Sequence, residues 1–457
     1  MRWIFGRVRA DYKSERLKMS KKNGLRTAAL LLAALSIVAS TVVNPADMAL
    51  AQKPQAAPPA PNARNAAVMA ATDAVLRETS EIRRLSILRP VKSGSQSRAE
   101  IERMIIKNMN EDMTPEEMHA SELAMKKLGL VPANFELRPF VIRLLTEQVA
   151  GYYDPKAQQF YLADWIELEG QEPVIAHELT HALQDQHFNL RRFENWPKGD
   201  SDAELAAHAV IEGDATFTMI RYMWRDIKRA LAFARSMESN KSSSAQFDSA
   251  PRALRETLLF PYEQGMQWCT ALYGRGGWAR ISQAFAELPQ STEQILHAEK
   301  YFKREAPVKV EMADVSQLLG SNWKRIDYDV NGEWSYYLIL DEFLKSEGES
   351  KRAAAGWGGD RYSVYTRGAT SRDVFLAQLT AWDAVDEAVE FFDAYAKRTE
   401  RRYKDASMTE HDQTPLRRVW QTGEGAVVME RRGQRVLILE GVPEKANVQS
   451  LASALWK

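Results

Sequence analysis

The segment PVIAHELTHALQDQHF, residues 173–188, decides how this chain is expected to fold. A proline is tolerated in the first turn of a helix, so Pro173 marks a good starting point. The apolar residues that follow have helical spacing and can anchor one face in a core; they are Val174, Ile175, Leu179 and Leu183. We therefore predict a helix over roughly residues 173–187.

Three polar residues of this helix carry its chemistry. His177 and His181 are four positions apart, so both rings lie on one face and can bind the same metal ion. Imidazole nitrogen suits zinc, which lowers the pKa of a bound water from 15.7 to about 7. Glu178 lies between the histidines and is placed to act as the general base. The pattern predicts a site for one zinc ion with hydrolytic chemistry.

A catalytic zinc site needs a third protein ligand, and Glu212 is the leading candidate. The segment from Ala203 to Arg229 contains few helix breakers and predicts a second long helix. Glu204, His208 and Glu212 are spaced by four along it and share one face. That face can be laid against the helix that carries the two histidines.

Other residues compete for the role of third ligand. His187 falls ten residues after His177, but a return to the metal needs a turn, and Gln184 is a poor residue for one. No glycine occurs between Gln171 and Lys198. His208 and Asp214 are the remaining alternatives.

Two residues beside Glu212 have supporting roles. We expect Asp214 to accept a hydrogen bond from a ligand histidine and fix its tautomer. Gly213 predicts a close approach of the two helices that form the site. His208 can equally be a buried, hydrogen-bonded histidine.

These residues resemble the zincin metallopeptidases, and among them the glutamate-type group with two histidines and a downstream glutamate. The resemblance covers residues 148–219 and implies His177, His181 and Glu212 as zinc ligands, with Glu178 as base. In that group an upstream antiparallel strand edge binds extended substrate, and residues 148–162 look like its counterpart. The fold implied is a mostly helical zincin-like core with a short antiparallel edge hairpin.

One position departs from that family pattern. Many glutamate zincins have an acid four residues after the ligand glutamate, where this chain has Thr216. The supporting role of Asp214 is less secure for that reason. The phrases HALQDQHF at 181–188 and STEQILH at 291–297 also resemble a group of poorly characterised exported bacterial proteins.

Peptide hydrolysis needs a donor for the negative oxygen that develops on the substrate carbonyl. His297 follows a short helical stretch and is our preferred donor, although a structural role for this histidine is also open. The other candidates are Tyr301, Tyr262, Arg361 and Tyr362.

Composition excludes several other functions. Of the 457 residues, 61 are Lys or Arg and 61 are Asp or Glu, so no basic excess favours nucleic acid as a partner. Cys269 is the single cysteine, which excludes an intrachain disulfide and a cysteine-based metal cluster. Four of the seven histidines fall between His177 and His208, which concentrates the candidate ligands in one place.

The N-terminus predicts export. A positive segment precedes the uncharged apolar run 27–43, and Ala49-Leu50-Ala51 fits a cleavage site. Residues 1–51 are therefore a signal peptide or a membrane anchor, and the rest is periplasmic or secreted. The run 27–43 is the only contact with a membrane that we expect. Residues 52–67, rich in proline and alanine, predict a linker.

The fold class expected for the whole chain is α+β. Residues 68–350 form the helical zincin-like domain, and residues 351–457 form a small C-terminal α+β module, a sheet with two helices. A hairpin is expected to turn at Arg432-Gly433, and residues 357–361, WGGDR, predict a tight turn.

These expectations combine into an exported zinc-dependent metallopeptidase acting on polypeptides. Two alternatives remain open: a non-catalytic exported zinc-binding or scaffold protein that keeps the same fold, and a zinc hydrolase of a non-peptide amide. Sequence does not distinguish them, and it leaves the substrate and the oligomeric state undefined.

Overall fold

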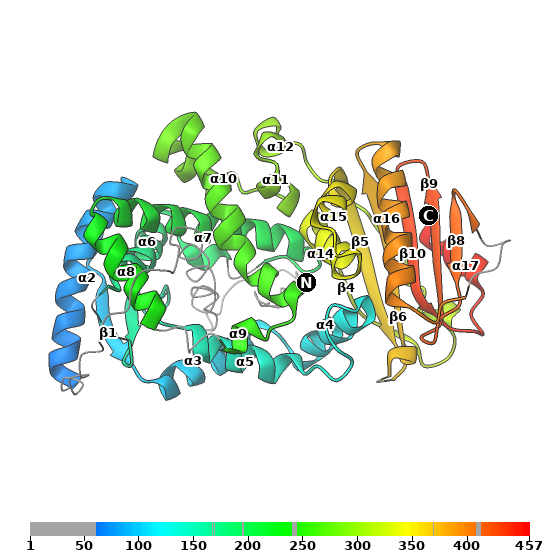
Figure 1. The fold of residues 1–457 in the computed structure, drawn as a ribbon, viewed down its shortest axis with the longest axis horizontal. Coiled ribbons are helices and arrows are strands. Elements are labelled where there is room, and N and C mark those ends of the chain that lie inside the picture. Colours follow the sequence, from blue (N-terminus) through cyan, green and yellow to red (C-terminus); the bar gives the residue numbers. More distant parts are fainter. Residues whose placement is uncertain are drawn as a thin grey trace, which may run out of the picture.

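The structure, a computed structural model, describes residues 61–457 apart from 167, 169, 194–195, 240–244, 369 and 408–412. It is a mixed α+β fold in which a helical part and a sheet module lie end to end along the long axis (Figure 1). This confirms the predicted α+β class and the C-terminal sheet.

The helical part contains most of the helices and one small sheet. Its helices are α2 (Pro61–Arg83), α3 (Arg98–Asp112), α4 (Pro115–Leu128), α5 (Leu137–Gln148), α6 (Glu172–Phe188), α7 (Ser201–Trp224), α8 (Ile227–Ser239), α9 (Ala245–Asp248), α10 (Arg252–Ala284), α11 (Thr292–Leu296) and α12 (Ala298–Lys303), with a short 3-10 turn, η1 (Leu190–Phe193). Thr114 caps α4 and Pro115 begins it, as its sequence predicts.

The small sheet has the order β1-β3-β2, with β1 (Lys92–Gln96), β2 (Gly151–Asp154) and β3 (Gln159–Ala163). β2 and β3 form the predicted antiparallel hairpin, with Tyr152 opposite Tyr161. β1 adds in parallel to the other side of β3. The free edge on the side of α6 is therefore that of β2.

The sheet module begins earlier than residue 351. Its antiparallel sheet has the order β4-β5-β6-β10-β9-β8-β7, and its first strand, β4, pairs with β5. The strands are β4 (Lys324–Asp329), β5 (Trp357–Thr366), β6 (Val374–Trp382), β7 (Gln413–Thr414), β8 (Arg417–Trp420), β9 (Ala426–Arg432) and β10 (Arg435–Val442). The helices are α13 (Ser316–Leu319), α14 (Gly332–Leu344), α15 (Glu347–Ala354), α16 (Val385–Arg402) and α17 (Val448–Leu455), with a 3-10 turn, η3 (Ser371–Asp373).

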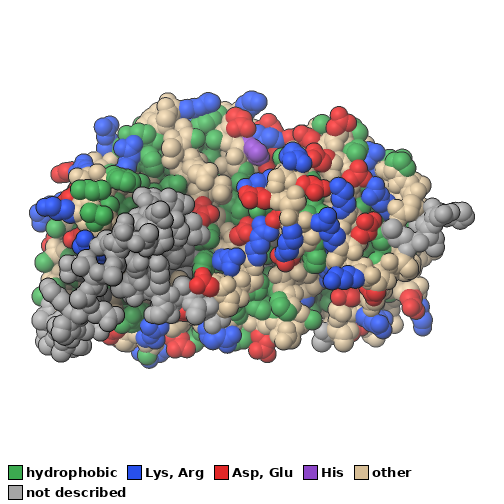
Figure 2. Space-filling model, viewed as in Figure 1, with side chains coloured by type: hydrophobic (Ala, Val, Ile, Leu, Met, Phe, Trp, Pro, Cys, Tyr) green, Lys and Arg blue, Asp and Glu red, His purple; other side chains and the backbone are tan. Residues whose placement is uncertain are grey.

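Both faces of the central strands of this sheet are buried, because alternate residues pack into different cores. Leu376 and Ile438 join the core that contains α14 and α16, whereas Phe375 and Leu437 pack with Leu451 of α17. Figure 1 shows α16 lying across one face of the strands. On the visible surface, Lys and Arg are interspersed with Asp and Glu (Figure 2).

A buried aspartate joins the two parts through a helix N-terminus. Asp329 of β4 accepts a hydrogen bond from the backbone N–H of Ser201, the first residue of α7, at 2.9 Å. A carboxylate is favoured at this position by the unpaired N–H groups and the helix dipole. The sheet module thus fixes the N-terminal end of α7.

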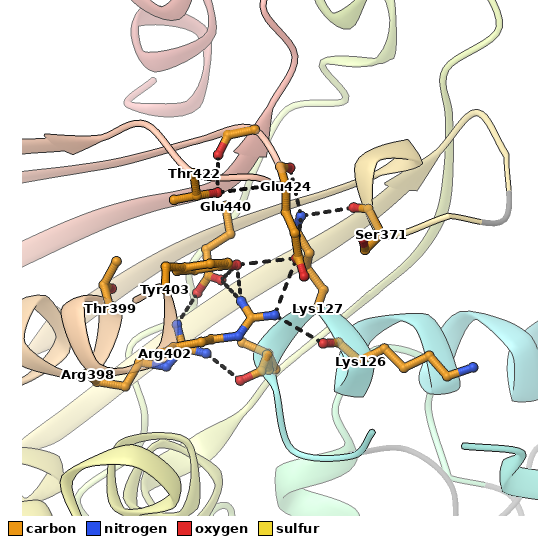
Figure 3. A network of polar contacts seen from close by, with 12 residues as sticks. Lys126, Lys127, Ser371, Arg398, Thr399, Arg402, Tyr403, Thr422, Glu424 and Glu440 are labelled. Carbon is orange, nitrogen blue, oxygen red and sulfur yellow. Dashed lines mark hydrogen bonds and ion pairs between the residues drawn. The ribbon is translucent and has the colours of Figure 1, made fainter. Parts of the chain in front are cut away.

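A second junction ties α4 to the sheet module through buried charges (Figure 3). Glu440 of β10 pairs with Arg398 at 2.7 Å and with Arg402 at 3.1 Å. Lys127, fully buried, pairs with Glu424 at 3.2 Å and donates to the carbonyl of Ser371. Three cations face two carboxylates here. Backbone carbonyl oxygens accept further hydrogen bonds from these cations; for example, Arg402 donates to the carbonyl oxygen of Lys126 at the end of α4.

Three local expectations differ from the structure. Residues 61–67 begin α2 instead of extending the predicted linker, since this segment contains helix-favouring alanines and Arg64 donates to the carbonyl of Ala163. The stretch 357–361 is the first half of β5 and not a tight turn, because it pairs with β6. The helix predicted from Ala203 to Arg229 is interrupted between α7 and α8.

The predicted signal or anchor, residues 1–51, and the first part of the predicted linker lie outside the described residues. Among the helices that the structure describes, none has the length and apolar character needed to cross a bilayer.

Candidate metal centre

Helices α6 and α7 bring three ligand atoms together. His177 Nε2 lies 3.2 Å from Glu212 Oε2, His181 Nε2 lies 3.3 Å from the same oxygen, and the two Nε2 atoms are 3.1 Å apart. All three side chains are buried. Sequence reasoning placed Glu212 first among the candidate third ligands, and the structure brings it to the histidine pair.

These separations fit a tetrahedral zinc site. Zinc bonds of about 2.0–2.1 Å at tetrahedral angles hold neighbouring ligand atoms about 3.4 Å apart. The donor set of two imidazoles and one carboxylate also matches zinc chemistry. Glu212 Oε1 and Glu178 Oε1 are buried without a hydrogen-bond partner among the described residues, as expected of oxygens that serve a metal ion or a reacting water. The residues present therefore fit the ion.

The other candidate ligands lie elsewhere. His187 Nε2 is 2.7 Å from the carbonyl oxygen of Ser86, a hydrogen bond that holds the ring at the end of α6. Neither His208 nor Asp214 belongs to the donor group, although both are buried on α7. His187 is excluded by the direction of its ring, since its helix continues to Phe188 without the turn that a return to the metal requires.

Glu178 is held by the edge strand. Its Oε2 accepts a hydrogen bond of 2.9 Å from the backbone N–H of Tyr153 in β2. The Tyr153 hydroxyl also donates to Asp185 at 3.0 Å, so one residue joins β2 to α6 at two points. This arrangement fixes one carboxylate oxygen of Glu178 and leaves the other without a partner among the described residues.

Without a bound ion, burial and mutual charge govern the pKa values of these side chains. Burial lowers the pKa of His177 to about 4 and raises that of Glu178 to about 8. Burial also opposes the charge of His181 and Glu212, but their attraction outweighs it. The pKa of His181 rises to about 9, and that of Glu212 falls to about 2.

The partner of His181 Nδ1 is the amide oxygen of Gln184 and not the carboxylate of Asp214. Gln184 Oε1 lies 2.9 Å from His181 Nδ1, and Gln184 Nε2 donates to Asp214 Oδ2 at 2.9 Å. The predicted direct contact between Asp214 and a ligand histidine is therefore wrong, since the amide of Gln184 lies between them. Asp214 in turn pairs with Arg83 of α2 at 2.6 Å.

Tyr262 of α10 packs against one of the ligands. Its ring stacks on His177 with the centroids 6.1 Å apart and the planes at 27°. Its buried hydroxyl has no hydrogen-bond partner among the described residues. Burial raises the pKa of Tyr262 well above its usual value, and the charges of Glu212 and Glu178 add to the effect, so the hydroxyl keeps its proton.

The preferred oxyanion donor, His297, is placed differently. It lies between α11 and α12, with Nε2 2.9 Å from Glu333 Oε1 of α14. Glu333 and the hydrogen bond to it raise the pKa of His297. Its contacts join α11 to α14, which is the structural role left open for it above. Tyr262, named among the other candidates, stacks on the ring of His177.

Gly213 has the packing role that was predicted, but against a different helix. A methyl carbon on Gly213 would lie 2.2 Å from the backbone of Gly265 in α10, and one on Gly265 would lie 2.3 Å from the carbonyl oxygen of Ala209. The close approach is therefore between α7 and α10. Glu212 precedes Gly213 on α7 and Tyr262 lies on α10, so the same helix contact brings both residues to the site.

Comparison with known proteins adds information about the sheet module only. A family model described as a domain of unknown function (DUF8575) matches residues 317–452, which run from α13 into α17. No curated protein and no solved structure matches the chain. The matched segment leaves out the donor group, so the case for its chemistry rests on geometry.

Proposed function

We propose that this protein is a zinc-dependent metallopeptidase whose ion is held by His177, His181 and Glu212. The observation that carries the proposal is the convergence of Nε2, Nε2 and Oε2 at separations of 3.1, 3.2 and 3.3 Å. Glu178, which follows His177 in the same helical turn, adds a carboxylate beside this group. Metal-assisted amide hydrolysis uses such a set of two imidazoles, a carboxylate and an adjacent base.

The surrounding elements support a zincin-like core. An antiparallel hairpin, β2–β3, lies directly before the helix with the two histidines, and the next long helix supplies the glutamate. This order of elements is what the resemblance to glutamate zincins implies. The likeness covers the site and its immediate scaffold, whereas the sheet module lies outside it.

The residues around the site divide the chemical work among them. Zinc, when bound, polarises a carbonyl and acidifies a water molecule. Glu178 Oε1 accepts the proton of the attacking water and delivers it to the leaving amine nitrogen, while Oε2 stays fixed by Tyr153. The hydroxyl of Tyr262 donates a hydrogen bond to the carbonyl oxygen as negative charge develops on it.

The edge of β2 offers a place for extended substrate. The carbonyl oxygen of Ala150 accepts a hydrogen bond from the N–H of Ala163 in the neighbouring strand, whereas the N–H of Tyr153 points the other way, to Glu178. Backbone groups therefore alternate along β2, and those of Gly151 face the same side as those of Tyr153. Apart from the N–H of Tyr153, which Glu178 holds, the groups on this side can pair with a peptide by strand addition, which favours polypeptide over a compact amide as substrate.

Export remains part of the proposal. The apolar run 27–43 and the cleavage pattern at 49–51 indicate a periplasmic or secreted protein, or one held at a membrane by that run.

The test is hydrolysis of a defined peptide library by the full mature chain. We expect cleavage in the zinc-loaded protein, loss after chelation, and recovery when stoichiometric zinc is returned. Zinc binding without cleavage of any peptide would favour the non-catalytic alternative. Cleavage restricted to non-peptide amides would favour the other one.

A further inference from the structure

A chain of polar contacts runs from the metal site to α2 at the other side of α6. His181 Nδ1 contacts Gln184 Oε1 at 2.9 Å, Gln184 Nε2 donates to Asp214 Oδ2 at 2.9 Å, and Arg83 Nε donates to Asp214 Oδ1 at 2.6 Å. All four side chains are fully buried. Arg83 lies outside the segment 148–219 that resembles the zincins, so nothing in that resemblance predicts it.

The orientation of the Gln184 amide follows from its neighbours. Its Nε2 faces two acceptors, Asp214 Oδ2 at 2.9 Å and the carbonyl oxygen of Ile211 at 3.0 Å. Since an oxygen at that position would meet two other oxygens, Oε1 must face His181. An oxygen facing Nδ1 requires that Nδ1 carry the hydrogen, which leaves the lone pair of Nε2 free for a metal ion.

Arg83 fixes the carboxyl group of Asp214 in the position that this orientation needs. Its Nε donates to Oδ1 at 2.6 Å, which leaves Oδ2 to accept the hydrogen bond from the Gln184 amide. Arg83 is itself held by a hydrogen bond to Ser282 at 3.2 Å and by the ring of Trp278, 4.9 Å from its central carbon.

The two histidines differ in this support. Nδ1 of His177 is buried without a hydrogen-bond partner among the described residues, whereas Nδ1 of His181 has Gln184. The polar chain therefore acts on one ligand and not on the other. Such outer partners typically change metal affinity by about 10–100-fold.

We infer that Arg83, Asp214 and Gln184 form a positioning relay that fixes the tautomer and ring orientation of His181 and raises the zinc affinity of the site. The inference rests on the proposed zinc site and makes α2 part of it. These are positioning residues, because none of them touches the ion or the substrate.

The test compares zinc dissociation constants, measured by competition with a chromophoric chelator on the full mature chain. Gln184→Leu should weaken zinc binding about 10–100-fold. The matched control is Gln378→Leu. Gln378 is also a fully buried glutamine with polar partners, Tyr395 and Asn331, but it lies in the sheet module. The control should lower stability and leave zinc affinity within about twofold of wild type.

A charge-swap pair separates orientation from simple loss of packing. Gln184→Glu alone places two carboxylates side by side, and Asp214→Asn alone leaves Arg83 facing an amide, so each should weaken zinc binding. In the double variant, the new carboxylate at position 184 can accept from His181, and the new amide at position 214 can donate to that carboxylate and accept from Arg83. We expect the double variant to recover about tenfold or more of the lost affinity.

Four outcomes distinguish the relay from the proposed function. Equal zinc affinity for Gln184→Leu and Gln378→Leu, or no recovery in a folded double variant, overturns the relay while the proposed function stands. Nitrogen-15 spectra of the zinc-loaded protein that show His181 protonated at Nε2 overturn it as well. Weakened zinc binding in a protein that cleaves no peptide supports the relay and overturns the peptidase proposal instead.

Discussion

The crossing of α7 and α10 gives a sharp prediction that links packing to the metal site. Gly265→Ala would place a methyl carbon 2.3 Å from the carbonyl oxygen of Ala209, about 1 Å closer than an ordinary contact. Since the clashing atom is backbone, the helices must separate. Overpacking of this kind costs about 1–3 kcal/mol, and the better helix propensity of alanine offsets about 1 kcal/mol of it. We expect a net loss of up to about 2 kcal/mol in the free energy of unfolding.

The same helix provides a matched control. Gly274 also lies in α10, but a methyl carbon there would meet nothing within 4 Å. Gly274→Ala should therefore stabilise the protein by about 0.5–1 kcal/mol through helix propensity alone. The two variants differ by the same methyl group, so the opposite signs isolate the contact with Ala209.

The assay is urea-induced unfolding followed by far-ultraviolet circular dichroism, with zinc titrations on the same samples. Separation of the helices moves Glu212 on α7 away from the histidines of α6, so Gly265→Ala should also bind zinc more weakly, whereas Gly274→Ala should not. Equal stability of the two variants would refute the interpretation of the crossing. Lower stability with unchanged zinc affinity would refute only its link to the site.

Three further predictions concern single groups. Burial raises the pKa of Asp200 to about 6, with Asp329 adding to the effect, so the wild type loses stability as pH rises from about 4 through 6. Asp200→Asn keeps the cap on Ala203 and should be more stable than wild type by about 1–3 kcal/mol above pH 6.5 and equal to it below pH 4; a constant difference in urea unfolding across this range would contradict the assignment. Glu440→Gln leaves Arg398 and Arg402 without their shared carboxylate and should cost about 3–5 kcal/mol, whereas Lys127→Met removes the excess cation and should stay within about 1 kcal/mol of wild type. Similar losses for both, measured by chemical unfolding, would show that the network does not depend on its charge balance. Tyr262→Phe should lower kcat about 10²-fold with zinc content and KM nearly unchanged, and an unaltered kcat would remove Tyr262 from the mechanism.

Local patterns were sufficient to predict the elements that carry the ligands. The apolar spacing around Leu179 and Leu183 predicts α6, and the spacing of Glu204, His208 and Glu212 predicts the face of α7 that is laid against it. The hairpin before α6 followed from its turn residues. These features depend on neighbours in sequence, so a single chain shows them.

Contacts between residues far apart in sequence could not be predicted for the same reason. Arg83 and Asp214 are 131 residues apart, and no local pattern marks an arginine as the partner of a distant aspartate. β1 has the sequence KSGSQ, which lacks an apolar alternation, and it forms because β3 offers a parallel edge. The sequence does contain a signal for the role of Gln184 that was not used. A polar residue three positions after His181 on a helix lies within hydrogen-bonding reach of that ring.

Glu178→Gln provides the most direct test of the proposal that this is a hydrolytic zinc site. The substitution keeps the size of the side chain and the hydrogen-bond acceptor for Tyr153, and it removes only the proton acceptor. Zinc content and the rate of peptide cleavage should be measured on the same preparation of wild type and variant. We expect one zinc per chain in both proteins and a loss of cleavage of about 10²–10⁴-fold in the variant. Cleavage at the wild-type rate by the variant, or by chelated protein, would contradict the assignment of His177, Glu178, His181 and Glu212 as a hydrolytic zinc centre.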